Sequence, residues 1–330
     1  MTWVLLSRRS SARLVVAAVA VLARAGDAAA QPSWTRVDSA GPPARIIPAL
    51  TFDGTRGVTV LFGGDRMRST PIGDTWEWDG ARWRSFEGEA PRARYGQVMA
   101  HDTERGLTIL FGGYDKADTL FGDTWAWNGT TWRLLASDGP EPRRNGGFAY
   151  DPDRKRIVLH GGYAGRPRRD DRFVTDTWEW DGVRWTRAAT SGPEPRYGQA
   201  MIYDAARRRM LLFGGNDHSG HIYGDTWTWD GRAWTKISES GPPPRGGAQL
   251  AWDAGTRSVL LFGGFARDTT YDDVWRWDGA RWAKVEGAAV PALIFPMMAH
   301  DTRRDRLVLV GQRVPGQASV ETWERALRDE

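Results

Sequence analysis

The stretch Thr108-Ile109-Leu110-Phe111-Gly112-Gly113 decides the fold of this chain. Its apolar residues indicate a buried strand, and the two glycines after them tolerate the positive φ angles of a sharp bend. The stretch recurs about every 50 residues, a period typical of repeats of small β-sheets. The glycine pairs begin at Gly63, Gly112, Gly161, Gly214 and Gly263, and a degenerate copy stands at Gly311-Gln312.

Each repeat is expected to contain four strands. One strand precedes the quoted stretch and runs from an arginine to an aspartate, as from Arg94 to Asp102. A hairpin follows, in which tryptophans alternate with other residues around an Asp-Gly or Asn-Gly pair. Such a pair favours a tight turn because both central positions take positive φ. The pairs are Asp79-Gly80, Asn128-Gly129, Asp181-Gly182, Asp230-Gly231 and Asp278-Gly279.

These features resemble the kelch repeats of proteins such as the galactose oxidase central domain and exported bacterial kelch proteins. The resemblance implies that each repeat is one four-stranded antiparallel blade of a β-propeller. Counting the repeats predicts an all-β propeller of six blades over residues 31–330.

The two ends of the chain are expected to meet in the last blade. The sixth repeat ends at Glu330 without its outermost strand. The missing strand matches Trp34-Thr35-Arg36-Val37 near the other end of the chain, which resembles Trp185-Thr186-Arg187 of a complete repeat. We therefore expect the N-terminal segment to close the ring and remove its open edge.

The 19 tryptophans are expected to pack between blades. All except Trp3 and Trp252 occupy equivalent positions of the two outer strands in their repeats. A sugar-binding or aromatic-cage role is the alternative. Burial of about 200 Å² per indole is enough to explain them as core residues.

The N-terminus resembles an export signal. Arg8 and Arg9 precede the apolar residues 14–22, and Ala28-Ala29-Ala30 provides a small-residue cleavage site. The sequence therefore predicts a signal peptide over residues 1–30 and a secreted or periplasmic protein, with a membrane anchor as the alternative. After removal of the signal we expect no membrane span.

Composition excludes several kinds of site. The chain has no cysteine, so it can form neither disulfides nor the Tyr–Cys cofactor of kelch-type copper oxidases. The net charge is +4, and it falls to +1 without the four arginines and one aspartate of residues 1–30. That charge gives no reason to expect a nucleic-acid partner. We expect a monomer without cofactors.

Arginines are expected at the ring's mouth on the face that carries the loops between blades. Each starts the first strand of a repeat, and together they would attract a carboxylate, sulfate or phosphate. The predicted ligand-binding residues are Arg45, Arg94, Arg143, Arg196, Arg245, Tyr95, Tyr197 and Asn145, with Arg144 close by. The kelch resemblance also implies that such arginines bind acidic ligands. In the alternative, each arginine pairs with an aspartate: Asp74, Asp123, Asp176, Asp225 or Asp273.

Histidine gives little reason to expect a metal centre. His101, His160 and His300 occupy repeat positions that hold aromatic or apolar residues elsewhere, so we expect them in the framework. His218 and His221 with Asp217 form the one weak candidate for a metal site, although a solvated loop explains the same residues.

The sequence therefore predicts a binding module for an acidic small molecule, a glycan or a protein. The first alternative is a cofactor-free carbohydrate-active isomerase resembling the sialic acid mutarotases, which share the six-bladed ring. The second is an interaction protein with no small ligand. Fold alone does not decide among them.

Overall fold

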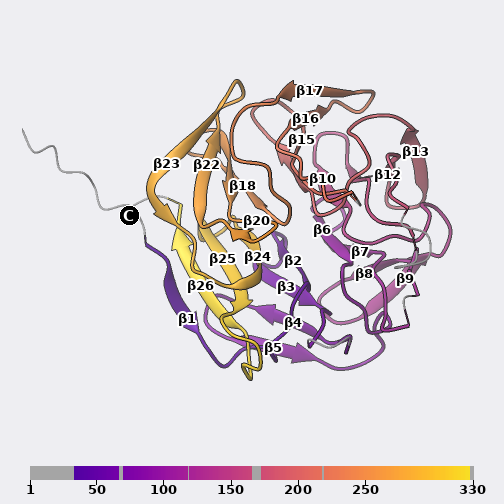
Figure 1. Ribbon diagram of the computed structural model, residues 1–330. Helices are drawn as coiled ribbons and strands as arrows, with labels where there is room; N and C mark the ends of the chain where they lie inside the picture. Colours follow the sequence, from indigo (N-terminus) through magenta and orange to yellow (C-terminus); the bar gives the residue numbers. More distant parts are fainter. Residues whose placement is uncertain (1–32, 67–69, 118, 166–171, 218, 328–330) are drawn as a thin grey trace, which may run out of the picture. The chain divides into compact units, whose positions relative to one another are not determined.

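The computed structural model describes residues 33–66, 70–117, 119–165, 172–217 and 219–327. Every regular element within these ranges is a β-strand, and the strands form six four-stranded antiparallel sheets and one two-stranded ribbon. The sheets are the six blades of a propeller, as predicted (Figure 1). The predicted signal peptide, residues 1–30, lies outside the described residues.

The first three blades follow the repeat from its first strand to its fourth. Blade 1 comprises β2 (Ala49–Asp53), β3 (Val58–Phe62), β4 (Thr75–Trp78) and β5 (Trp83–Phe86). Blade 2 comprises β6 (Val98–Asp102), β7 (Leu107–Phe111), β8 (Thr124–Trp127) and β9 (Trp132–Ala136). Blade 3 comprises β10 (Gly147–Asp151), β11 (Arg156–His160), β12 (Thr177–Trp180) and β13 (Trp185–Ala189).

The last three blades include the ribbon and the closing strand. Blade 4 comprises β14 (Ala200–Asp204), β15 (Arg209–Phe213), β16 (Thr226–Trp229) and β17 (Trp234–Ser238). Blade 5 comprises β18 (Gln249–Asp253), β19 (Ser258–Phe262), β22 (Asp273–Trp277) and β23 (Trp282–Ala289), and β20 (Phe265–Ala266) with β21 (Thr269–Thr270) forms the ribbon between them. Blade 6 comprises β24 (Ile294–Asp301), β25 (Arg306–Gln312), β26 (Glu321–Ala326) and β1 (Thr35–Asp38).

The chain closes its own ring in blade 6. Strand β1 pairs antiparallel with β26, with Thr35 opposite Glu324 and Arg36 opposite Trp323. The indigo strand lies beside the yellow one in Figure 1. This confirms the predicted closure, in which the two ends of the described chain share one sheet.

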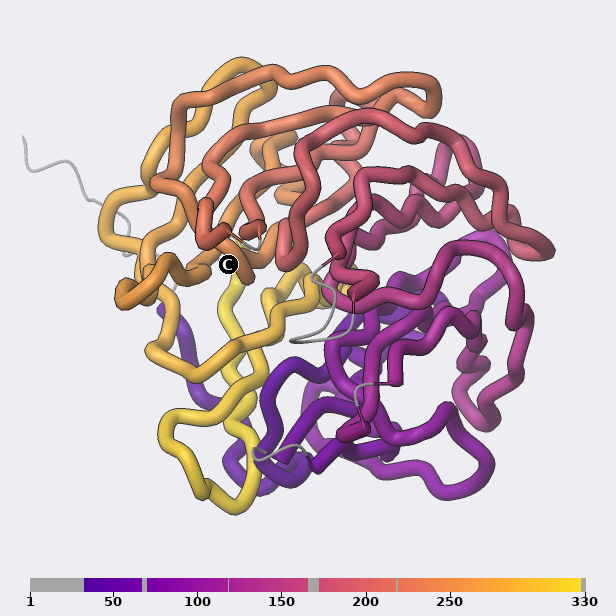
Figure 2. The backbone as a smooth tube through the Cα atoms, turned by 45° about the vertical axis from the view of Figure 1, so that its right-hand side comes forward, coloured from indigo at the N-terminus to yellow at the C-terminus, as the bar shows by residue number. Residues whose placement is uncertain are grey.

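The first strand of each blade lies innermost. Strands β2, β6, β10, β14, β18 and β24 each form one edge of their sheet and contact one another in succession around the ring. Figure 2 follows the chain from blade to blade around this ring. The residues just before these strands therefore surround the mouth of the ring.

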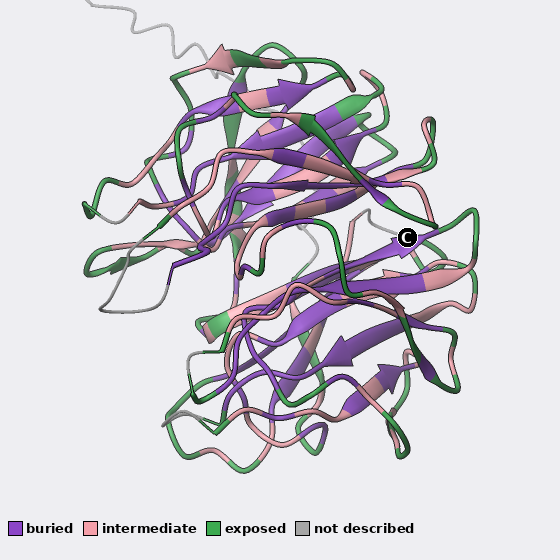
Figure 3. Cartoon of the chain, turned by 90° about the vertical axis from the view of Figure 1, so that its right-hand side faces the viewer, coloured by how far each residue is buried: buried purple, intermediate pink, exposed green. Residues whose placement is uncertain are grey.

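Apolar side chains fill the spaces between adjacent blades. In one such cluster Phe111 of blade 2 packs edge-on against Trp185 of blade 3, with ring centroids 5.4 Å apart. Figure 3 shows the buried residues concentrated in the strands and the exposed ones in the connections. Burial of these large side chains supplies the main stabilisation of a ring without disulfides.

Tryptophan side chains also join the blades by hydrogen bonds. The indole of Trp132 in blade 2 donates to the hydroxyl of Thr75 in blade 1 over 2.8 Å. The same bond recurs from Trp83 to Thr322, Trp185 to Thr124, Trp234 to Thr177 and Trp282 to Thr226. The packing role expected for the tryptophans is confirmed at these positions.

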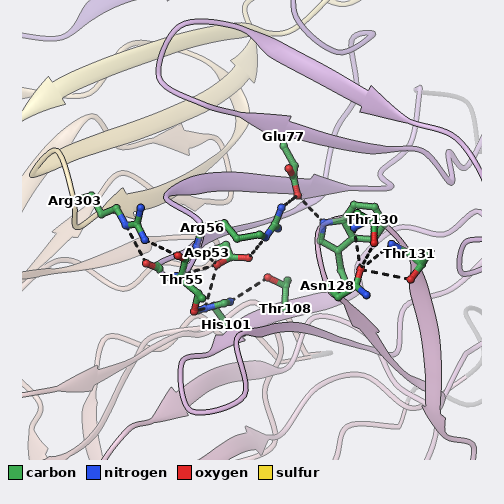
Figure 4. A network of polar contacts seen from close by, with 12 residues as sticks. Asp53, Thr55, Arg56, Glu77, His101, Thr108, Asn128, Thr130, Thr131 and Arg303 are labelled. Atoms are coloured by element: carbon green, nitrogen blue, oxygen red, sulfur yellow. Dashed lines mark hydrogen bonds and ion pairs between the residues drawn. The ribbon is translucent and has the colours of Figure 1, made fainter.

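The face opposite the inter-blade loops carries tight turns and a dense polar network (Figure 4). Arg56 donates to Asp53 over 2.8 Å and also contacts Glu77. His101 of blade 2 lies 2.9 Å from the hydroxyl of Thr55 in blade 1. The His101–Thr55 contact joins two neighbouring blades, so the expected framework role of His101 is confirmed.

Candidate ligand site at the mouth of the ring

The five predicted arginines are buried inside their own blades. Arg94 donates from both terminal nitrogens to Asp123, over 2.6 and 2.9 Å, and from one of them to the Gly112 carbonyl over 3.0 Å. Each of the five is at most 1% exposed. The other four form the same pairs: Arg45 with Asp74, Arg143 with Asp176, Arg196 with Asp225 and Arg245 with Asp273.

These contacts confirm the ion-pair alternative for all five positions. Burial raises the pKa of Asp123, but the hydrogen bonds and charge of Arg94 outweigh that effect and hold the pKa below its usual value. Each guanidinium is therefore balanced by an ionised carboxylate. Ligand binding by the five arginines stays a prediction that this geometry does not favour.

Blade 6 replaces this pair with a different arrangement. Leu293 stands where the other blades have the arginine, and Glu321 stands where they have the aspartate. Arg313 donates to Glu321 over 3.0 Å, and Arg36 of the closing strand contacts it at 3.3 Å. The acidic group thus remains neutralised, partly by a residue from the other end of the chain.

A rim of left-handed residues surrounds the mouth on the loop face. Each rim residue stands two positions after the arginine, or after Leu293 in blade 6, and has a positive φ. The rim consists of Ile47, Gly96, Asn145, Gly198, Gly247 and Phe295.

Backbone hydrogen bonds join the rim residues of successive blades. The amide of Asn145 donates to the Gly96 carbonyl, Gly198 to Asn145 and Gly247 to Gly198, each over 2.8 Å. The amide of Gly96 donates to Ile47 over 3.4 Å. The rim is therefore one continuous feature from blade 1 to blade 5.

Blades 2 to 4 line their side of the mouth with aromatic rings around one arginine. The guanidinium of Arg144 lies between the rings of Tyr114 and Tyr163, at 4.0 and 4.6 Å from their centroids. Tyr95 stacks on Tyr114, and Tyr197 lies 6.5 Å from Tyr163. We call these residues the arginine arc: Tyr95, Tyr114, Arg144, Tyr163 and Tyr197.

Arg144 differs from the five buried arginines in its partners. It is half-buried, and no carboxylate of the described residues lies within ion-pair distance of its guanidinium. Its Nε has no hydrogen-bond acceptor. A half-buried cation fixed between two aromatic rings, without a carboxylate partner among the described residues, is suited to bind a carboxylate.

Two further polar groups lie at the arc. The Asn216 side-chain oxygen is buried without a partner in blade 4, next to the arc. Burial and a side-chain hydrogen bond with Tyr95 raise the pKa of Tyr114, so its phenol stays protonated. The predicted Tyr95, Tyr197 and Asn145 all belong to this part of the mouth.

Sequence reasoning missed Tyr114, Tyr163 and Asn216. All three directly follow a Gly-Gly pair. One of the two isolated β-bridges that each forms leads to a residue that follows a buried arginine: Tyr95, Arg144 and Tyr197. The position after Gly-Gly varies between repeats although its surroundings do not. That variability was a usable signal for a ligand-contacting position.

The remaining histidines show no sign of a metal centre in the part of the chain that the structure describes. His218 lies outside the described residues. Asp217 accepts hydrogen bonds from Ser219 and from the His221 amide within its own loop, and His221 packs edge-on against Tyr223. His160 and His300 are enclosed by framework residues, as expected.

No protein-family model matches the chain, and no curated protein matches it either. No helix among the described residues is long and apolar enough to cross a bilayer.

Proposed function

We propose that this propeller is an exported binding module that recognises a carboxylate-bearing ligand at the mouth of the ring, on the loop face. The observation that carries the proposal is Arg144, the half-buried guanidinium between Tyr114 and Tyr163 that has no ionic partner among the described residues. The proposal thus moves the acidic ligand from the five buried arginines to Arg144.

The electrostatic argument rests on the contrast between Arg144 and its neighbour Arg143. The guanidinium of Arg143 donates hydrogen bonds to Asp176 and to the Gly161 carbonyl. Within the described ranges Arg144 has no such partners, so a bound carboxylate gains a charge-assisted hydrogen bond without displacing an internal one. Tyr95, Tyr114 and Tyr163 are buried and hold Arg144 in place. The half-buried ring of Tyr197 adds an aromatic surface beside them, which suits an acidic sugar or another small acid.

The kelch assignment and the export route belong to the same proposal. The repeated Gly-Gly, Asp-Gly and tryptophan positions support kelch-type blades. Residues 1–30 have the pattern of a signal peptide. N-terminal sequencing of the protein recovered from the periplasm or medium tests the export, with a new terminus near residue 31 as the expected result.

Calorimetric titration tests the binding site. We expect wild-type protein to bind one of three acids, glucuronate, N-acetylneuraminate or phenylacetate, and Arg144→Ala to weaken that binding about tenfold or more. Arg92→Ala is the matched control. Arg92 lies on the same face but is 71% exposed and paired with Asp115, so its loss should change affinity less than about twofold.

Two results would contradict the proposal. One is that none of the three acids binds the wild-type protein at millimolar concentration. The other is that Arg144→Ala and Arg92→Ala bind the same acid equally well.

A further inference from the structure

The half of the mouth formed by blades 5, 6 and 1 carries four apolar residues near its rim. Phe265 follows Gly-Gly in blade 5 and Ile46 follows Arg45 in blade 1. Two charged residues hold the equivalent positions after the glycines: Asp65 in blade 1, which is buried, and Arg313 in blade 6, which pairs with Glu321. Phe265 and the rim residue Phe295 meet edge-on, with ring centroids 5.6 Å apart. We call these residues the apolar arc: Ile46, Ile47, Phe265 and Phe295.

Two members of the apolar arc hold their side chains in an unfavourable backbone conformation. Ile47 has a φ of 51° and Phe295 a φ of 42°. The other four rim positions hold glycine or asparagine, the residues that adopt this conformation most readily. A β-branched residue and a bulky aromatic one are uncommon there, and such strain tends to occur at functional sites.

Burial in the core does not account for Phe295. Its side chain is 44% exposed, one of few large apolar residues of the described chain that are. Glycine or asparagine would relieve the strain and remove the exposed ring. The rim therefore holds the Phe295 ring at the mouth although both the backbone conformation and the exposure to water disfavour it.

We infer that the ligand is a compact amphipathic carboxylate, with its acid on Arg144 and an aryl or branched apolar group on Phe295 and Ile47. This inference rests on the proposed function and narrows it. The arginine arc occupies blades 2 to 4 and the apolar arc the other three, so the two arcs face each other across the ring. A uniformly hydrophilic acid would leave the apolar arc exposed to water, whereas an amphipathic acid covers it with its apolar group.

The test compares three acids on one protein. Phenylacetate should bind at least about tenfold more tightly than either acetate or glucuronate, because only phenylacetate can cover Phe295. Phe295→Gly and Phe295→Asn should each weaken phenylacetate binding about fivefold and leave acetate unchanged. Both replacements are compatible with the positive φ, so both proteins should fold, as circular dichroism and melting temperature will show.

Val183→Ala is the matched control, because Val183 is 78% exposed on the opposite face. It should change the affinity for none of the acids. The inference is overturned if phenylacetate binds no better than glucuronate, or if both Phe295 variants bind it like the wild type. If an acid still binds in those cases and Arg144→Ala weakens its binding, the proposed function is supported although this inference fails. If no acid binds at all, both fail.

Discussion

At the scale of single residues, His160 is the clearest exception to the repeat. It stands at the end of β11 where blades 1, 2, 4 and 5 have phenylalanine. Its ring lies 4.6 Å from Trp234 and is fully buried, with no partner for Nε2. Burial lowers its pKa to about 3, so the ring stays neutral in the folded protein.

His160→Phe should make the protein more resistant to acid. The unfolded chain takes up a proton at His160 near pH 6.5, whereas the folded chain does so only near its own pKa of about 3. Between these values the histidine therefore costs about 1.4 kcal/mol of unfolding free energy for each pH unit of acidification.

Urea unfolding of the two proteins at pH 7 and pH 4.5 measures this difference. The gap between His160→Phe and wild type should widen as the pH falls. His221→Ala, at an exposed loop position, is the control and should follow the wild type. Parallel pH profiles for wild type and His160→Phe would contradict the account.

At the scale of single elements, β1 matters more than its four residues suggest. It completes the blade-6 sheet, and Trp34 just before it packs edge-on against Phe262 of blade 5. The strand therefore both covers the edge of β26 and seals the junction between two blades.

Deletion of residues 33–37 should lower the unfolding free energy by at least about 3 kcal/mol, because it removes both a paired strand and the partly buried Trp34. The measurement is thermal and denaturant unfolding. Arg36→Ala, which removes only a half-exposed ion pair with Glu321, should cost less than about 1 kcal/mol. Melting of the deletion variant within a degree or two of wild type would refute this role of β1.

The sequence was most informative about elements and least informative about the rim. Glycine pairs, Asp-Gly turns and tryptophan spacing specify strands and turns locally, so the blade count and the closing strand could be predicted. Isoleucine and phenylalanine do not favour a positive φ, so the positive φ of Ile47 and of Phe295 could not be predicted from these residue types. The same is true of Arg144: that no described carboxylate pairs with it depends on how the loops of three blades meet.

At the scale of the whole molecule, the ring has one junction unlike the others, between blades 5 and 6. The threonine that accepts a tryptophan hydrogen bond elsewhere is Val274 here, and the Trp34 indole nitrogen is buried without a partner. The turn arginine that contacts the next blade, as Arg105 donates to the Asp181 carbonyl, is replaced by Thr256. The junction that the closing strand seals is thus the one with fewest repeated contacts.

Val274→Thr should strengthen this junction by giving the Trp34 indole an acceptor. We expect a gain of about 1 kcal/mol in unfolding free energy. Val308→Thr is the matched control, because Val308 is equally buried in blade 6. A hydroxyl buried there without a tryptophan partner should destabilise by about 1 to 3 kcal/mol. A loss of stability in both variants would contradict the proposed hydrogen bond.

Anomalous diffraction from crystals soaked with p-bromophenylacetate tests the ligand site most directly. The account predicts a bromine peak at the apolar arc beside Phe295, the carboxylate on Arg144, and no peak in Arg144→Ala crystals soaked alike. A bromine peak on another part of the propeller, or one that persists in Arg144→Ala, would contradict it.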